Sequence, residues 1–217
     1  MEFRNKKNEI FDLDGFEYYS SGECAKVYRK DDIAFKLYNF DCKYRLYLSR
    51  KVFEILKTIK SSGLVELIDY YHNSTSHILP MDAYSMKFID GKEVELITAP
   101  KEYLSDVLTK LDETIKKLSD RKIVIFDTNC DNILFKENGA TIIDPDQFFH
   151  SRLLSKKTIY ELNKQKIFEY FISTIMKEMK EKRVSYLLSN PYKRGLSLDK
   201  CVMNKLKGNN IYESITI

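Results

Sequence analysis

Apolar and polar residues follow two different patterns along this chain. Up to about residue 88 they form short runs rich in Tyr, Phe, Ile and Val, with turn-forming residues between them, such as Asp31-Asp32. Runs of this kind predict β-strands. Beyond residue 91, apolar residues recur mainly every three or four positions, which predicts amphipathic helices. The pattern therefore predicts an α+β protein with a small antiparallel β lobe at residues 1–88, a connection at 89–91 and a reduced, mainly helical lobe at 92–217.

Individual elements follow from the same pattern. Residues 16–38 predict a strand followed by a hairpin, and 64–71, 77–80 and 84–88 predict further strands of a sheet of about five. An apolar stripe at 44–60 predicts a helix inside the β-rich part. Three more helices are predicted at 104–118, 155–183 and 196–207, with a possible break in the middle of the second.

One stretch of the helical part has a strand-like pattern and carries acidic residues. The apolar run at 123–126 ends at Asp127, and Asn132 opens a second apolar run. Asn138-Gly139 is a strong two-residue hairpin turn, and the returning strand ends at Asp144. We therefore expect three oxygen-bearing side chains at one end of a hairpin, and such ligands suit Mg²⁺ with bound phosphates.

Composition narrows the class of protein. The chain has 217 residues, which suits one compact domain or two small lobes, and 43% hydrophobic with 31% charged residues is ordinary for a globular protein. The net charge of +4 is small and spread along the chain, so we expect no nucleic-acid partner. Four cysteines without a C-x-x-C pair indicate neither zinc nor a disulfide framework. Without a long apolar run we expect no membrane partner and a cytoplasmic protein.

The acidic stretch resembles a known superfamily. Asp127-x-x-x-x-Asn132, followed by a hairpin and Asp144, resembles the catalytic loop and metal-binding Asp of protein-kinase-like proteins. The alternative is a plain β-hairpin with surface carboxylates. Upstream, Ile33-Ala34-Phe35-Lys36 resembles the V-A-I-K strand of that superfamily. An outward-facing lysine in an alternating strand is the other interpretation, and we favour the first because the motifs occur in the expected order.

Two further segments resemble the nucleotide-binding parts of these proteins. Ser20 to Val27 resembles a degraded glycine-rich loop, in which Gly22 matches the middle glycine, Ala25 replaces another, and Val27 follows. Met86 to Gly91 resembles the hinge, and the resemblance implies that Met86, Lys87, Phe88 and Ile89 contact the adenine. An ordinary hairpin turn and a strand ending in an Asp-Gly turn are the alternatives. Glu93 or Glu95 is a weaker candidate for a ribose hydroxyl.

The chain also departs from the superfamily pattern. Glu54 is the only acid inside the predicted 44–60 helix, so the resemblance assigns it to Lys36, but it lies off the apolar stripe and a solvated Glu54 fits as well. Ile125-Phe126 replaces the usual His-Arg, and no Ala-Pro-Glu motif follows Asp144. The resemblance is therefore to a compact, atypical kinase-like protein of bacterial or phage type, and it covers residues 16–148.

The resemblance implies an ATP-dependent phosphotransferase that uses Mg²⁺ and a hydroxyl acceptor. Lys36 would bind the α- and β-phosphates, Asn132 and Asp144 would hold the metal, and Asp127 would take the acceptor's proton. Asp146 would hold a second metal or a basic acceptor, or is a solvated turn residue. We expect a protein acceptor, because the short chain lacks large acceptor-binding insertions. The alternatives are a small-molecule kinase of the aminoglycoside or choline type and a nucleotide-binding pseudokinase.

Overall fold

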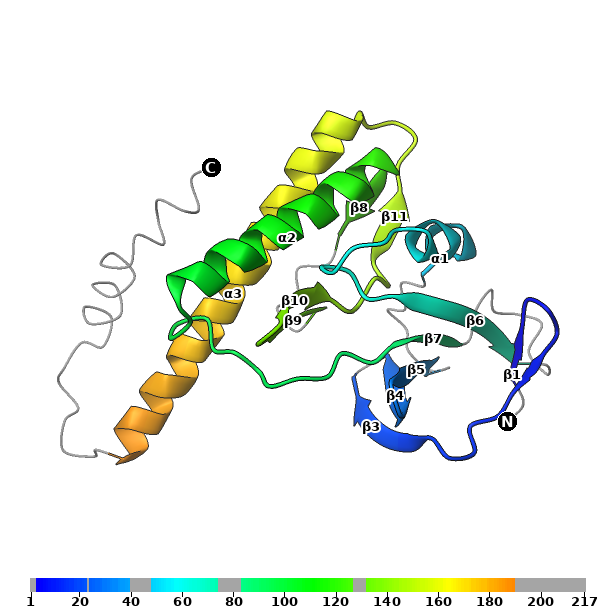
Figure 1. Cartoon of the computed structure of the whole chain (residues 1–217), viewed down its shortest axis with the longest axis horizontal. Helices are drawn as coiled ribbons and strands as arrows, with labels where there is room; N and C mark the ends of the chain where they lie inside the picture. Colours follow the sequence, from blue (N-terminus) through cyan, green and yellow to red (C-terminus); the bar gives the residue numbers. More distant parts are fainter. Residues whose placement is uncertain (1–2, 23, 40–47, 74–82, 127–131, 190–217) are drawn as a thin grey trace.

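The computed structural model describes residues 3–22, 24–39, 48–73, 83–126 and 132–189 of the chain. These residues form an α+β structure in which a seven-stranded antiparallel sheet lies at one side and two long helices lie at the other (Figure 1). Two small hairpin-like sheets lie between them (Figure 1). The predicted division into a β-rich and a mainly helical part is confirmed at this level.

The large sheet has the strand order β2-β1-β6-β7-β5-β4-β3. Its strands are β1 (Phe3–Asn5), β2 (Ile10–Phe11), β3 (Glu17–Ser21), β4 (Ala25–Lys30), β5 (Ile33–Tyr38), β6 (Leu67–Asn73) and β7 (Ala83–Lys87). Asp31, at φ 53°, forms the predicted turn between β4 and β5. The sequence had not indicated β1 and β2, and the predicted strand at 77–80 lies outside the described residues.

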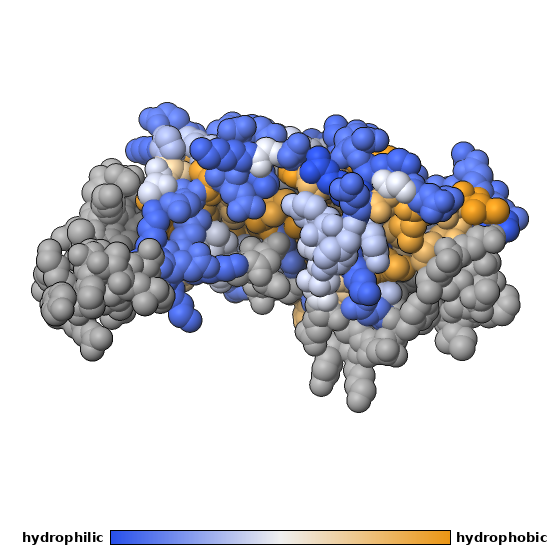
Figure 2. Space-filling model, turned by 90° about the horizontal axis from the view of Figure 1, so that it is seen from below, coloured by the Kyte–Doolittle hydropathy of each residue, from blue (hydrophilic) through white to orange (hydrophobic). Residues whose placement is uncertain are grey.

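The two faces of this sheet carry different side chains. Phe3, Phe35 and Tyr71 are buried on the outer face, beneath the turn region that follows β2. Ala34, Tyr38 and other residues at alternate positions face the other way, into the main core of the protein. Figure 2 shows hydrophobic residues, in orange, at the surface beside residues of intermediate hydropathy, in pale colours, at the edge of the sheet. In the same view the outline of the molecule is indented between the sheet and the helices.

Three helices lie within the described residues: α1 (Arg50–Lys57), α2 (Lys101–Asp120) and α3 (Lys156–Ser189). Ser49 begins α1, because its hydroxyl accepts the N–H of Val52 at 3.3 Å. The helix predicted at 104–118 is confirmed as α2, and the one predicted at 155–183 is α3, which is continuous. The helix predicted at 196–207 lies outside the described residues.

The segment between α2 and α3 forms two short antiparallel pairs. β8 (Ile123–Ile125) pairs with β11 (Phe148–His150), and β9 (Ile133–Lys136) pairs with β10 (Gly139–Ile142). The β9–β10 turn consists of Glu137 and Asn138, one residue earlier than predicted. Gly139 opens β10 at φ +132°, a conformation that a side chain would disfavour, so this glycine serves the strand entry rather than the turn itself.

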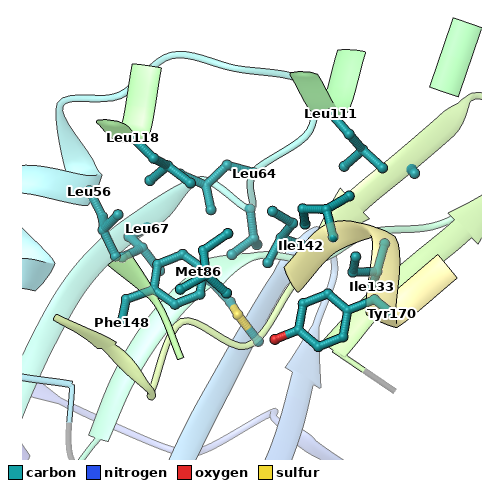
Figure 3. Close-up of a cluster of buried hydrophobic side chains, with 14 of the residues drawn as sticks. Leu56, Leu64, Leu67, Met86, Leu111, Leu118, Ile133, Ile142, Phe148 and Tyr170 are labelled. Atoms are coloured by element: carbon teal, nitrogen blue, oxygen red, sulfur yellow. The ribbon is translucent and has the colours of Figure 1, made fainter. Parts of the chain in front are cut away.

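The β-rich and helical parts share backbone hydrogen bonds and one core. Ile142 of β10 accepts the N–H of Val65 at 2.9 Å and donates its own N–H to Gly63 at 3.0 Å. Side chains from both parts pack into a single cluster, as Figure 3 shows for Leu67 and Met86 beside Ile142, Phe148 and Tyr170. The sheet is therefore fixed directly against the β9–β10 hairpin.

Candidate functional site

Lys36 lies in the middle of β5, on the face of the sheet that points toward the helical part. Its neighbours Phe35 and Leu37 pack into the outer aromatic cluster, while Ala34 and Tyr38 belong to the main core. Because side chains alternate across a strand, Lys36 faces the core side together with Ala34 and Tyr38. The Lys36 side chain is only 10% exposed, which requires a polar partner for its ammonium.

The β9–β10 hairpin places two of the predicted metal ligands at its open end. The register pairs Ile133 with Ile142, and the next bond along the hairpin runs from the N–H of Ile143 to the carbonyl of Asn132 at 2.9 Å. Asn132 and Asp144 therefore lie at the same end of the hairpin, as the sequence predicted. Asn132 is buried, whereas the Asp144 side chain is 30% exposed.

Lys36 and Asp144 meet in the structure although 108 positions separate them in the chain. The Lys36 Nζ lies 2.7 Å from Oδ2 of Asp144 and 2.9 Å from Oδ2 of Asp146. The strand lysine and the segment after β10 thus form one charged cluster, with one ammonium between two carboxylates.

Asp146 is the more enclosed of the two acids. Its Oδ1 accepts the hydroxyl of Tyr38 at 2.6 Å and the hydroxyl of Tyr84 at 3.1 Å. Its backbone N–H donates to Oδ1 of Asp144 at 3.2 Å. The Asp146 side chain is 14% exposed, so of the two interpretations offered by the sequence, that of a solvated turn residue was wrong.

The electrostatics of the cluster follow from burial and charge. Burial alone would lower the pKa of Lys36, but the carboxylates of Asp146 and Asp144 outweigh burial and raise that pKa above its ordinary value. Burial raises the pKa of Asp146, against the opposite effect of the Lys36 ammonium. Burial and the nearby Asp146 carboxylate raise the pKa of Tyr84 well above 10. At neutral pH the cluster therefore holds a protonated Lys36, and Tyr84 keeps the hydroxyl proton that it donates to Asp146.

The predicted phosphate-binding turn joins β3 to β4. The N–H of Gly22 donates to the carbonyl of Ala25 at 2.9 Å, and a side chain at Gly22 would meet nothing within 4 Å. Ala25 is buried, and Val27 packs partly buried against the main core beside Lys36. Cys24 in the same turn is disulfide-bonded, a bond that the cysteine spacing had not indicated.

The predicted hinge follows β7. Met86 is buried in the main core and pairs with Ala34 across β5 and β7, which places both on the Lys36 face of the sheet. The N–H groups of Lys87 and Phe88 already donate to the carbonyls of Glu66 and Asp32, at 2.8 and 2.6 Å. These two N–H groups are therefore used within the protein in this state.

Side chains around the hinge have separate contacts. The Phe88 ring lies 3.8 Å below the Arg29 guanidinium and 5.1 Å from the Tyr19 ring, so it packs against the β3–β4 hairpin. Ile89 is partly buried against the main core.

The two ribose candidates, Glu93 and Glu95, are both paired elsewhere. Glu93 contacts Lys136 at 3.3 Å, and Glu95 contacts Lys182 of α3 at 2.6 Å.

The structure does not bring Glu54 to Lys36. Glu54 pairs with Lys6 at 2.9 Å on the outside of α1, where both side chains are about two-fifths exposed. The buried face of α1 consists instead of Val52, Phe53 and Leu56. Glu54 lies off this face because an α-helix turns 100° per residue and the apolar residues occupy the core side.

Asp127 lies outside the described residues, but the strand that leads to it is fixed by a residue that sequence analysis missed. Asn163 of α3 is fully buried, accepts the N–H of Ile125 at 2.8 Å and donates to the carbonyl of Ile123 at 2.9 Å. The sequence could have indicated this role, because Asn163 lies on the core face of a predicted amphipathic helix and a buried amide needs hydrogen-bond partners.

The side chains of the cluster offer few ligands for a metal ion. Among the residues that the structure describes, no group of three or more His, Cys, Asp and Glu is arranged to hold a metal ion. Asn132 and Asp144 supply an amide and a carboxylate oxygen at one hairpin end, which suits a hard cation that takes its remaining ligands from phosphates and water. This pair would fit a hard cation such as Mg²⁺ that takes most of its ligands from outside the protein, and does not form a closed protein cage.

Comparison with known proteins gives no independent assignment. No family model matches this chain, and no curated protein matches it. In the described part of the chain, no helix is both long enough and apolar enough to cross a membrane. The geometry of the site is therefore the basis for assigning a function.

Proposed function

We propose that this protein is an ATP-dependent phosphotransferase with a kinase-like fold, which transfers the γ-phosphate of ATP to a hydroxyl of a protein acceptor. One observation carries the proposal. Lys36 and Asp144, singled out from separate sequence motifs, lie 2.7 Å apart although 108 positions separate them. A plain hairpin with surface carboxylates has no reason to meet a buried strand lysine.

The proposed roles follow from position and charge. Lys36 binds the phosphates as a fixed cation in a partly dry site, where such a charge acts more strongly than in bulk water. Asn132 and Asp144 hold Mg²⁺, which neutralises phosphate charge when bound. Asp127 orients the acceptor hydroxyl and accepts its proton. Gly22, Ala25, Val27 and Ala34 leave room for the nucleotide, and Met86 to Ile89 contact the adenine.

Transfer from labelled ATP with Mg²⁺ tests the reaction. We expect label on the protein itself or on a protein of an added lysate. Label on small metabolites would instead indicate a small-molecule kinase, and nucleotide binding without transfer would indicate a pseudokinase.

Calorimetric titration with ATP tests the roles of the two acids. We expect Asp144→Asn to lose most of the Mg²⁺-dependent binding and Asp127→Asn to retain it, because one is proposed to hold the metal and the other the acceptor. Asp106→Asn, an exposed α2 carboxylate paired with Lys110, is the matched control and should bind like the unmodified protein. Equal losses in the Asp144 and Asp127 variants would refute this division of roles.

A further inference from the structure

Asp146 contacts more of the charged cluster than any role assigned so far requires. We propose that Asp146 is a positioning residue that holds Lys36 in place of a helix acid, and so leaves Asp144 available to the metal. The role of Asp146 in positioning Lys36 for phosphate transfer rests on the proposed function. The ion pair between Lys36 and Asp146 does not depend on it.

Both oxygens of Asp146 are engaged. Oδ2 lies 2.9 Å from the Lys36 Nζ, and Oδ1 accepts the hydroxyls of Tyr38 and Tyr84. The two tyrosines come from β5 and β7, neighbours in the sheet, so the carboxylate is held from the same rigid surface that presents Lys36. A carboxylate with both oxygens occupied and little exposure is a poor metal ligand and a good anchor for an ammonium.

Asp144 differs from Asp146 in exposure and in its partners. Its side chain is about twice as exposed, at 30% against 14%, and its second oxygen accepts the backbone N–H of residue 146. Both oxygens of Asp144 are thus engaged as well, and exposure is what distinguishes it from Asp146. In the proposed arrangement the more exposed Asp144 would reach a metal, while Asp146 would keep its contact with Lys36.

Glu54, the acid of α1 that the sequence suggested as a partner, is not placed to pair with Lys36. For Glu54 to reach Lys36, α1 would have to rotate about its axis, which would break the Lys6 contact and expose Val52 or Phe53, both buried against the core. Exposing such side chains to water is unfavourable. Lys36 is therefore held without an acid from α1.

Unfolding by urea in two double-mutant cycles tests the contact without any activity measurement. The first combines Lys36→Met with Asp146→Asn, and the second combines Lys36→Met with Glu54→Gln. We expect strong coupling in the first cycle: each single change lowers the urea midpoint, and the double variant falls no further than the more affected single one. The second cycle should be additive. Coupling of Lys36 to Glu54, with additivity at Asp146, would overturn the inference.

Should Asp146→Asn fail to fold, Tyr38→Phe replaces it in the cycle. This change keeps the ring and removes the shortest hydrogen bond to Asp146, so it should couple to Lys36→Met with the same sign. Additivity in this milder cycle would likewise contradict the inference.

The Mg²⁺ requirement of phosphate transfer tests the second half of the inference. In Asp146→Asn the Lys36 ammonium is left with Asp144 as its one carboxylate partner in the cluster and competes more strongly with the metal, so the half-saturating Mg²⁺ concentration should rise about tenfold. Glu54→Gln should leave it unchanged. If the half-saturating Mg²⁺ concentration is unchanged in a folded Asp146→Asn protein, the proposal that Asp146 leaves Asp144 available to the metal is refuted. Coupling in the first cycle without any transfer by the unmodified protein would refute the proposed function and retain the Lys36–Asp146 contact.

Discussion

The two faces of the central sheet show how one strand serves two purposes. On the outer face, Phe35 stacks on Phe11 with ring centroids 4.4 Å apart and touches Phe3, Phe16 and Tyr71, all apolar or aromatic. On the inner face, the next residue, Lys36, sits between two carboxylates. The outer face supplies stability through burial, while the inner face keeps a charged cluster whose net contribution to stability is small.

The comparison implies that stability and activity can be separated along β5. Changes at outer-face positions should alter the free energy of unfolding and leave the chemistry of the folded fraction intact. On the inner face, Ala34 and Tyr38 pack into the main core, so the separation applies at Lys36. A change there should alter activity, and should alter stability because it leaves a charge without its partner.

Phe35→Ala should give the largest change in stability. Removing a fully buried ring that contacts four other rings leaves a cavity, and such truncations cost about 3 to 5 kcal/mol in free energy of unfolding. Urea unfolding measures this loss. Phe35→Leu, which fills more of the space, should lose less. A cost below 1 kcal/mol for Phe35→Ala would show that the outer cluster does not stabilise the sheet.

Lys36→Met should give the largest change in activity. Loss of one preorganised charged group is expected to lower transfer by about 10²- to 10³-fold. The structure changes the expectation for stability, because Asp146 and Asp144 lose their cation and breaking such a pair costs about 3 to 5 kcal/mol. The double variant with Asp146→Asn should lose no more stability than the more affected single variant and should stay inactive, which separates the two losses.

The outer-face neighbour provides the control for this experiment. Leu37→Met keeps the volume on the same strand, so turnover and the urea midpoint should both stay close to those of the unmodified protein. A Lys36→Met protein with unchanged turnover would defeat the kinase assignment of β5.

Two buried tyrosines, one on each face of the sheet, allow single hydrogen bonds on the two faces to be compared. Tyr84 donates to the Asp146 carboxylate on the inner face, and Tyr71 contacts the Ser85 hydroxyl on the outer face at 3.2 Å. Hydrogen bonds to charged groups are worth about 1.5 to 3 kcal/mol and neutral ones about 0.5 to 1.5 kcal/mol. Tyr84→Phe should therefore destabilise more than Tyr71→Phe in urea unfolding, and the reverse order would contradict the charge difference between the faces.

The same two tyrosines predict a small effect at alkaline pH. Burial raises the pKa of both, and the carboxylates beside Tyr84 raise its pKa further. A raised pKa contributes stability that is present below pH 10, the unfolded value, and is lost as the pH rises toward the folded value. The free energy of unfolding, measured from pH 9 to 11, should fall as the pH rises. Tyr84→Phe should make this fall less steep than Tyr71→Phe does. An equal slope in both variants would contradict the stronger effect at Tyr84.

Much of the fold was predictable because it depends on local patterns. The turn at Asp31 and the helix α2 follow from local residue types and periodicity, and the same local rules placed Asn132 and Asp144 at one hairpin end. The shift of the β9–β10 turn by one residue shows the usual imprecision of boundaries. The N-terminal strands were missed because two or three residues carry no detectable alternation.

The partners within the site were less predictable because they depend on packing between distant segments. Asp146 had the sequence context of a solvated turn, and it became an anchor through Tyr38 and Tyr84, which lie 108 and 62 positions away. Glu54 was predicted to lie off the apolar stripe of its helix, and the structure directs it toward Lys6, away from Lys36. The meeting of Lys36 with Asp144 was predictable only through the order of the motifs.

The 108-residue separation between Lys36 and Asp144 also has a consequence for synthesis on the ribosome. At translation rates of about 5 to 20 residues per second, roughly 5 to 20 s pass between the addition of the two residues. The outer aromatic cluster is complete once β7 has emerged, whereas the inner face waits for β9, β10 and the acids that follow. During that interval the nascent sheet presents an apolar face and an unpaired ammonium, which makes it a natural target for chaperones.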